Sequence, residues 1–158
     1  MAYQKLQGRR AINVYPQDDV PIPSPSSKRV TGQNDAVVVG YLQDTSTDFT
    51  YYGVKAGDVV YNTTTGRAAK VLKVVGLNDL LLSADIFLVL SQDYVIYSME
   101  LSEDGPVLFV GTGGDLNIVT SGGDTVLLTN LPDASYVPIM VKSVQSTSTS
   151  CSNIIALW

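Results

Sequence analysis

The sequence predicts an all-β protein: a β-sandwich or barrel of short antiparallel strands, with an extended N-terminal arm. The first observation behind this prediction is that short runs rich in Val, Leu, Ile and Tyr recur from residue 34 onward. The second is that turn residues separate these runs every ~8–12 residues, a spacing typical of sandwiches and barrels. The third is that no stretch keeps the periodicity of an amphipathic helix over three turns.

Residues 1–33 are expected to form the arm. Prolines stand at positions 16, 21, 23 and 25, and proline removes backbone donors and restricts its neighbours to extended conformations. A disordered tail is the alternative, but disordered linkers are poor in large apolar residues. We therefore expect the arm to lie along a surface through apolar anchors. These anchors are Ile12, Val14, Tyr15, Val20 and Ile22.

The first β module is expected over residues 34–98. Its β-type runs are 36–42, 58–62, 68–75, 79–83 and 94–98, and Gly-, Thr- and Asn-containing turns separate them. Between the last two runs, the stretch SADIFLVL is interpreted as a helical turn with Ser83 as its N-cap.

The second β module is expected over residues 99–158, because Glu-Asp-Gly-Pro at 103–106 is the clearest internal break. Strands are expected at 107–111, 115–120, 124–130, 136–144 and 153–158. One continuous sandwich over both modules is the alternative to two closely packed modules.

Two Gly-Gly-Asp units, at 113–115 and 122–124, raise the question of a phosphate-binding loop. A P-loop ends in Gly-Lys-Ser/Thr, and this part of the chain has no lysine. The dinucleotide fingerprint fails because Leu116 stands at the third glycine position. We interpret both units as hairpin turns, and the strand after the first places Leu116, Ile118 and Thr120 on one face.

The residues available for catalysis are few. The chain has no histidine, which excludes histidine acid–base and nucleophilic chemistry and imidazole metal ligands. Cys151 is the single cysteine, so no intrachain disulfide is possible. Adjacent carboxylates, Asp18–Asp19 and Glu103–Asp104, lie in turn sequences beside Pro or Gly and are interpreted as solvated residues rather than a glycosidase pair. We expect no enzyme activity and no cofactor.

Two groups of side-chain oxygens could hold Ca²⁺. They are Asp44 with Asp48, and Asp115 with Asn117 and Asp124. Neither group matches the spacing of an EF-hand loop, and we predict no metal site.

Aromatic residues are interpreted mainly as packing residues. Trp158 ends an apolar strand and is expected to anchor its own core or a neighbouring subunit. Five tyrosines fall within or beside predicted strands, where packing is favoured, and a carbohydrate-stacking surface is the alternative. They are Tyr51, Tyr52, Tyr61, Tyr94 and Tyr97.

Charge is scarce and unevenly distributed. The net charge is −5, and only 16% of the residues are charged. Residues 1–30 hold five basic and two acidic residues (+3), and the remainder holds five basic and thirteen acidic residues (−8). An acidic body disfavours nucleic-acid binding, and the basic arm is expected to contact an acidic neighbour, with a solvated tail as the alternative. Its cations are Lys5, Arg9, Arg10, Lys28 and Arg29.

The low share of charged residues indicates that partners cover part of the apolar surface. No window approaches ~18 uninterrupted apolar residues, and the N-terminus lacks the apolar core of a signal peptide. We therefore expect no membrane insertion and no secretion, with synthesis and assembly in a cytosol.

Two segments resemble virion structural proteins of tailed bacteriophages. The first runs from DFTYYGVKAG to SADIF (48–87) and continues in YVIY, and the second runs from LFVGTGGD to NIIALW (108–158). The second is similar to small head proteins, which include capsid decoration proteins and the head-spike base proteins of phages and gene transfer agents. Its matching motifs are Val110–Gly114–Asp115, Gly122–Asp124, Pro138–Val141 and Ile155–Trp158.

The proline-rich DVPIPSPSS (19–27) also resembles the start of such proteins. One departure is Ser-Thr-Ser-Cys at 148–151, where the family pattern has Gly-Thr-Thr-Ala. This departure leaves the conformation of that loop, and any contact it makes, without support from the resemblance.

The resemblance implies a non-enzymatic protein of the outer surface of a phage head, a homotrimer bound to the major capsid protein. The expected mechanism is that the arm lies over adjoining capsid subunits, with its apolar anchors buried and its cations on acidic capsid surface. The alternatives are a head-spike base, a fibre-attachment protein, or a glycan-binding adhesion module.

Overall fold

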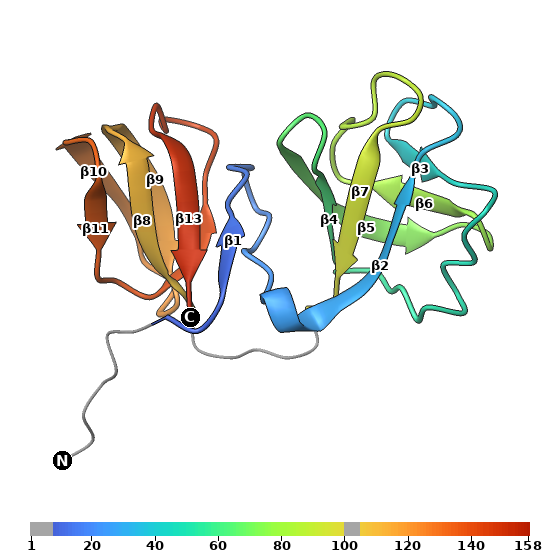
Figure 1. Cartoon of the computed structure of the whole chain (residues 1–158), viewed down its shortest axis with the longest axis horizontal. Coiled ribbons are helices and arrows are strands. Elements are labelled where there is room, and N and C mark those ends of the chain that lie inside the picture. Colours follow the sequence, from blue (N-terminus) through green and yellow to red (C-terminus); the bar gives the residue numbers. More distant parts are fainter. Residues whose placement is uncertain (1–7, 100–104) are drawn as a thin grey trace, which may run out of the picture. The chain divides into compact units, whose positions relative to one another are not determined.

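Strands make up nearly all of the regular structure in residues 8–99 and 105–158, the parts of the chain that the computed structural model describes (Figure 1). The predicted all-β class is confirmed. These residues form two compact units rather than one continuous sandwich. Residues 8–25 with 105–158 make up the first unit, and residues 26–99 make up the second.

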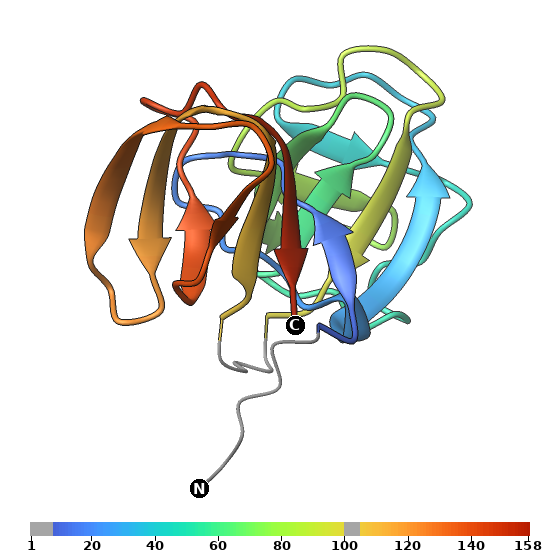
Figure 2. The same ribbon diagram turned by 60° about the vertical axis from the view of Figure 1, so that its left-hand side comes forward.

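The first unit contains two antiparallel sheets. Its strands are β1 (Ala11–Asn13), β8 (Val107–Thr112), β9 (Gly114–Thr120), β10 (Thr125–Leu131), β11 (Ser135–Val137), β12 (Val141–Val144) and β13 (Ser152–Leu157). One sheet has the strand order β1-β13-β8-β11, and the other has the order β10-β9-β12. Figure 2 shows the β9 and β10 side of this unit turned toward the viewer.

Buried apolar side chains alternate with half-exposed ones along the strands of the first unit. Leu108 and Val110 of β8 are buried, and so are Leu116 and Ile118 of β9. Leu116 and Ile118 therefore point from the same face of β9 into the core, and Thr120 at the end of this strand is half-exposed. Because side chains alternate across a strand, these residues meet those of β12 and β13 in one hydrophobic core, against which Trp158 packs.

The two Gly-Gly-Asp units differ in structure. Residues 122–124 close the β9–β10 hairpin, where Gly123 has a φ of +95°. Residues 113–115 do not form the predicted hairpin, because β8 and β9 belong to different sheets and the chain turns a corner between them. A Cβ at Gly113 would overlap the carbonyl oxygen of Leu131. Close approach of two backbones explains this glycine.

The predicted arm is extended, but residues 8–25 lie on the chain's own first unit instead of reaching a neighbouring subunit, and β2 (Lys28–Gln33) belongs to the second unit. β1, which includes Ile12, pairs with β13, and the chain then follows the first unit, with Val14 and Ile22 in its core and Val20 buried. Proline-rich extended backbone suits a sheet edge as well as a free arm. Burial of the apolar side chains stabilises the conformation in which this segment packs against the sheet.

The second unit contains one antiparallel sheet of six strands. They are β2 (Lys28–Gln33), β3 (Tyr41–Gln43), β4 (Val59–Asn62), β5 (Arg67–Val74), β6 (Asp79–Leu82) and β7 (Asp93–Tyr97), and a 3₁₀ turn, η1 (Pro25–Ser27), precedes β2. The strand order is β2-β7-β4-β5-β6-β3. Just after the end of β2, Asp35 N donates to the carbonyl oxygen of Gln43, the last residue of β3 (3.0 Å). The first and last strands therefore meet at one end without forming a ladder.

The core of the second unit gathers buried side chains from every strand of this sheet. The boundary between the units falls at the predicted Glu-Asp-Gly-Pro break, of which Gly105 and Pro106 are described. The predicted start of the first module, residue 34, differs from the structure, because β2 already belongs to the second unit.

Two predicted strands are shorter or divided. Residues 36–40 of the run 36–42 form a loop, and only its end lies in β3. The run 136–144 is interrupted after β11, at Pro138, because proline cannot donate to a ladder.

The predicted helical turn at SADIFLVL is wrong, since residues 83–90 contain no helix. Ser83 does not cap a helix: its Oγ accepts a hydrogen bond from Lys70 N (2.9 Å) on β5. Ile86 and Phe87 turn inward and are buried in the core of the second unit. Tertiary burial of these two side chains holds the segment in an irregular conformation.

Candidate interaction surface

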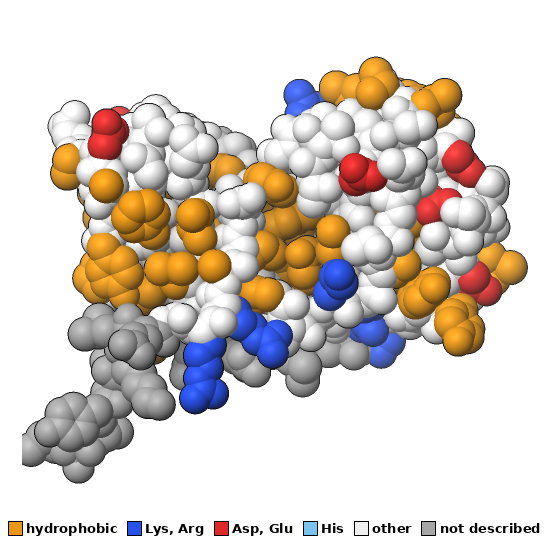
Figure 3. Space-filling model, viewed as in Figure 1, with side chains coloured by type: hydrophobic (Ala, Val, Ile, Leu, Met, Phe, Trp, Pro, Cys, Tyr) orange, Lys and Arg blue, Asp and Glu red, His pale blue; other side chains and the backbone are white. Residues whose placement is uncertain are grey.

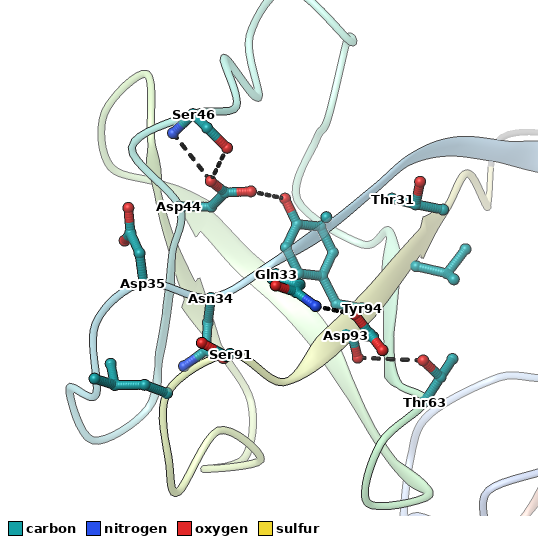
Figure 4. A pocket seen from close by; sticks show the side chains of 13 residues that line it. Thr31, Gln33, Asn34, Asp35, Asp44, Ser46, Thr63, Ser91, Asp93 and Tyr94 are labelled. Carbon is teal, nitrogen blue, oxygen red and sulfur yellow. Dashed lines mark hydrogen bonds between the residues drawn. The ribbon is translucent and has the colours of Figure 1, made fainter.

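The second unit carries an open depression with a volume of about 830 Å³. The ends of β2 and β7 and the loops after β2 and β3 surround it (Figure 4). Most of its lining is polar and includes Asp44 and Tyr94, and Leu90 and Val95 add apolar side chains. The side chains that line this depression determine what it could bind.

Asp44 is a carboxylate with only 1% of its surface exposed. Its Oδ2 accepts hydrogen bonds from the Tyr94 hydroxyl (2.7 Å) and Thr47 Oγ1 (2.7 Å). Its Oδ1 accepts hydrogen bonds from Ser46 N (3.0 Å) and Ser46 Oγ (2.5 Å), and Figure 4 shows how these donors converge. Four donors occupy both oxygens of the carboxylate. The group therefore acts as a structural link.

The protonation states of this pair are fixed near neutral pH. Burial by itself would raise the pKa of Asp44, but the hydrogen bonds from Ser46, Tyr94 and Thr47 outweigh it and hold the pKa below its ordinary value. Burial raises the pKa of the Tyr94 hydroxyl, and the adjacent Asp44 charge adds to this effect. Tyr94 thus remains a donor and Asp44 remains ionised. This pair is not arranged to exchange a proton with a substrate.

Gly32 of β2 makes room for the link between Asp44 and Tyr94. A Cβ at Gly32 would lie 2.5 Å from the Tyr94 hydroxyl oxygen and 2.6 Å from Asp44 Oδ2. Any side chain at this position would displace the hydrogen bond. Glycine is required here because the Tyr94 and Asp44 side chains lie so close to the backbone of β2.

Two loops beside the depression are tied together by the buried side chain of Asn34. Its Nδ2 donates to Ala36 O and to Val89 O, both at 2.9 Å. Its Oδ1 accepts a hydrogen bond from Gln92 N (2.8 Å). One amide therefore fixes the loop after β2 against the loop before β7.

Gln92 and Asn62 continue this network inside the second unit, and both side chains are buried. Asn62 Nδ2 donates to Ile86 O (2.7 Å) and to Gln92 Oε1 (3.2 Å), and Leu88 N also donates to Gln92 Oε1 (3.2 Å). Within residues 8–99 and 105–158, every buried side-chain nitrogen and oxygen has a hydrogen-bond partner. Satisfied polar networks of this kind give a segment one conformation.

Six apolar side chains project from the two tied loops, and we call this set the apolar rim. Val39 is 80% exposed, and the other five are 42–57% exposed. Figure 3 shows apolar side chains gathered over the loops at the top of this unit. The members are Val37, Val38, Val39, Leu88, Val89 and Leu90.

Most of the arm residues that were predicted to contact the capsid make contacts within the two units of this chain instead. Ile12 packs against the core of the first unit, and Tyr15 is half-buried. Arg29 forms an ion pair inside the second unit, where its Nε donates to Asp58 Oδ2 (2.8 Å). Burial removes Val14, Val20 and Ile22 from the set of surface anchors.

Three predicted cations are exposed, Arg9, Arg10 and Lys28. Lys5 lies outside the described residues. Trp158 is half-buried against the core of its own unit. The structure therefore leaves these three cations exposed and places the other described site residues, apart from Arg29, in the first unit.

Asp48 and Asp115, which belong to the two groups of oxygens, accept hydrogen bonds from backbone groups, Asp48 within a turn and Asp115 at the irregular part of the β9–β10 pair. Asp48 Oδ1 accepts hydrogen bonds from Thr50 N, Thr50 Oγ1 and Tyr51 N, and Asp115 Oδ1 accepts one from Asn130 N (2.9 Å). Among the described residues, no three His, Cys, Asp or Glu side chains are grouped to hold a metal ion.

Of the two pairs of adjacent carboxylates, the structure describes Asp18–Asp19. Asp18 accepts hydrogen bonds from Thr147 N (3.0 Å) and Thr147 Oγ1 (2.5 Å), which hold its pKa below its ordinary value. Glu103 and Asp104 lie outside the described residues. Asp18 therefore fastens the loop that contains Thr147 to the N-terminal segment of the first unit.

The five tyrosines divide into two groups. Tyr61, Tyr94 and Tyr97 are buried, as expected for packing residues. Tyr51 is 81% exposed and Tyr52 is about half as exposed, and their rings meet edge to face with centroids 5.3 Å apart. Asp48 holds the turn that presents them.

Sequence reasoning missed the apolar rim because its two segments were assigned to a strand and to a helical turn. One signal was present. The run 36–39 is Ala-Val-Val-Val without alternation, and such a strand needs cover on both faces. In the structure residues 36–40 form a loop instead of a strand, and Val37, Val38 and Val39 are exposed on it.

No protein-family model matches the chain, and no curated protein and no solved structure matches it. Among the described residues, no helix has the length and apolar character needed to cross a membrane.

Proposed function

We propose that the protein is a non-enzymatic decoration protein of a tailed-phage head, a homotrimer that binds the major capsid protein lattice on its outer surface. The phage assignment rests on the resemblance of residues 48–87 and 108–158 to virion structural proteins. The observation that carries a binding role is the exposure of large apolar side chains on both units in a chain with only 16% charged residues.

On the second unit these side chains include the apolar rim. On the first unit they are Leu127, Tyr136, Ile139 and Met140. Apolar surface of this extent favours a protein that is covered by neighbours in an assembly.

The proposed mechanism is stabilisation by linkage. A protein that binds the assembled lattice, and not the separate subunits, shifts the equilibrium toward the assembled shell. A trimer would contact several capsid subunits at once, and multivalent attachment raises the apparent affinity above that of one contact.

In this proposal the N-terminal segment makes fewer capsid contacts than an arm in which all of residues 1–33 lie on the capsid. Val14, Val20 and Ile22 serve the first unit, so the contacts proposed for this segment are those of the exposed cations Arg9, Arg10 and Lys28. Acidic patches on the capsid would be their counterpart. Truncation of residues 1–33 would remove core residues and would not test these contacts.

Co-sedimentation with decoration-free heads of the phage that carries this protein tests the proposal. The full chain should bind saturably, and the saturating number of copies per head should match the number of equivalent lattice sites. A spike base or fibre-attachment protein would saturate at far fewer copies. Absence of binding would overturn the decoration proposal. An Arg9→Glu/Arg10→Glu variant should bind more weakly if these cations contact the capsid.

A glycan-binding adhesion module is the second candidate function, and the exposed Tyr51–Tyr52 pair favours it. Aromatic faces held on a turn are suited to stack on sugar rings. A screen of host-surface oligosaccharides by NMR titration should detect binding that Tyr51→Ala abolishes. Binding that survives this substitution, or no binding to any oligosaccharide, would count against the candidate.

A further inference from the structure

We infer that the apolar rim is the surface through which the second unit docks on the capsid protein, and that its counterpart is an apolar patch bordered by Lys or Arg side chains. The inference rests on the proposed function for the identity of the partner. It adds the docking residues and the chemistry of the surface that receives them.

The rim is one continuous patch. Asn34 Nδ2 bonds the carbonyl groups of Ala36 and Val89, so the valines that follow Ala36 lie beside the residues around Val89. Gly40 N donates to Asp85 Oδ1 (3.2 Å), which ties the far end of the first loop to the second. Contiguous exposed apolar surface marks interaction sites more often than scattered residues do.

The rim is also held in one conformation. Asn34, Gln92 and Asn62 are buried, and their side chains satisfy the backbone groups of both loops. Loops that are ordered before binding lose little conformational entropy on docking. Burying the network behind exposed valines and leucines is an arrangement suited to binding a partner.

Acidic residues are the charged residues of the two loops that carry the rim. Residues 34–40 and 83–92 contain Asp35 and Asp85 and no lysine or arginine. Arg67, in the β4–β5 hairpin, is an exposed cation of the same unit, and Figure 3 shows a basic side chain at the top of this unit. Asp35 and Asp93 are exposed beside the depression, and Asp85 lies within the second loop. Such a border repels nucleic acid and anionic membranes and is complementary to a basic protein surface.

Sedimentation binding curves with decoration-free heads test the inference with matched variants. The rim variant is Leu88→Asp/Leu90→Asp. The control variant is Leu72→Asp/Leu77→Asp, which adds the same charge at apolar side chains of similar exposure elsewhere in the second unit. Thermal unfolding followed by circular dichroism first verifies that both variants remain folded.

We expect the rim variant to bind heads at least tenfold more weakly and the control variant to bind within about twofold of wild type, since loss at a docking centre exceeds loss elsewhere. Equal binding by both variants, or an equal loss in both, would overturn the docking role of the rim. Wild-type protein that fails to bind heads would overturn the proposed function itself.

Two further measurements test the partner chemistry. The binding constant of wild type should fall as salt rises, and Asp35→Asn/Asp93→Asn should reduce this salt dependence. An unchanged salt dependence would overturn the basic border. Sedimentation velocity without heads asks whether the rim instead joins copies of this chain. Conversion of a wild-type oligomer to monomer by the rim variant would assign the rim to self-association and overturn capsid docking.

Discussion

At the scale of single residues, the link between Asp44 and Tyr94 holds the second unit together where its sheet is incomplete. Tyr94 stands on β7, Asp44 follows β3, and the bond passes over Gly32 of β2. β2 and β3 are the first and last strands of the sheet and share no ladder. A charge-assisted hydrogen bond in a buried site is stronger than one in solvent. The link therefore substitutes for missing strand pairing.

Tyr94→Phe removes one donor to the buried carboxylate and leaves the ring in place. We expect the free energy of unfolding of the second unit to fall by ~2 kcal/mol, the range for hydrogen bonds to charged groups. Chemical denaturation followed by far-UV circular dichroism measures this change. Tyr51→Phe is the control, because the Tyr51 ring is 81% exposed and loses a hydroxyl in solvent. Equal effects of the two substitutions would contradict the role of the link.

Asp44 also predicts how stability depends on pH. Its pKa in the folded protein lies below the ordinary value, so the unfolded state binds the proton more tightly and acid favours unfolding. The contribution of Asp44 is fully present above its unfolded pKa of ~3.9 and is lost as pH falls through the folded value. Asp44→Asn should be less stable than wild type at pH 7, and the difference should shrink below pH ~4. A difference that stays constant down to the acid transition would contradict this prediction.

At the scale of elements, the segment before β2 belongs to the core of the first unit. Val14 N donates to Ile154 O (2.9 Å) and Ile22 N donates to Lys142 O (2.8 Å). The segment is thus bonded to β13 and β12 by its backbone as well as by buried side chains. Its prolines leave few backbone donors to satisfy, which suits the edge of a sheet.

Ile22→Ala should lower the free energy of unfolding of the first unit by about 2–5 kcal/mol, because it leaves a cavity in a core. Trp158 is the single tryptophan of the chain and packs against this core, so its fluorescence reports on the unfolding of the first unit. Leu127→Ala, at a side chain that is 48% exposed, is the control and should change stability little. An Ile22→Ala protein as stable as wild type would show that the segment is a detachable arm.

At the scale of the whole molecule, the chain leaves the first unit to build the second and then returns. The second unit is continuous in sequence, whereas the first joins residues 8–25 to residues 105–158. Each unit has its own hydrophobic core. A compact unit with its own core folds by itself when its segments are all present.

A fragment of residues 26–99 should therefore give a dispersed ¹H–¹⁵N spectrum and a cooperative unfolding transition. A fragment of residues 105–158 should not fold alone, because it lacks β1, Val14 and Ile22. Fusing residues 8–25 to residues 105–158 through a short Gly/Ser linker should restore folding. A folded 105–158 fragment would contradict the assignment of the N-terminal segment to this core.

Much of the fold could be predicted from local pattern. Runs of β-branched and aromatic residues between turns located the strands 59–62, 67–74 and 107–112 to within a residue or two, because side chains that alternate across a strand leave a readable period. The divided run 136–144 also had a visible cause, since Pro138 cannot donate to a ladder.

The candidate surface could be predicted far less well. Val37–Val39 and Leu88–Leu90 are apolar, and local pattern assigns apolar runs to regular elements. Their exposure depends on Asn34, Gln92 and Asn62, which come from three separate parts of the chain. Long-range hydrogen bonds leave no periodic signal in the sequence.

The sequence by itself determined the all-β class, the positions of most strands and the absence of histidine chemistry, because composition and short-range alternation carry that information. Only the tertiary structure decided that residues 8–33 complete two units, that Gly113 marks a corner between sheets, and that the rim is exposed. Those outcomes depend on which strands pair with each other and on which loops are hydrogen-bonded to a buried amide side chain, and the partners are far apart in the sequence. The free energy of burial comes from contacts between residues that are far apart in the chain. Which residues are buried together is therefore known only from the folded structure.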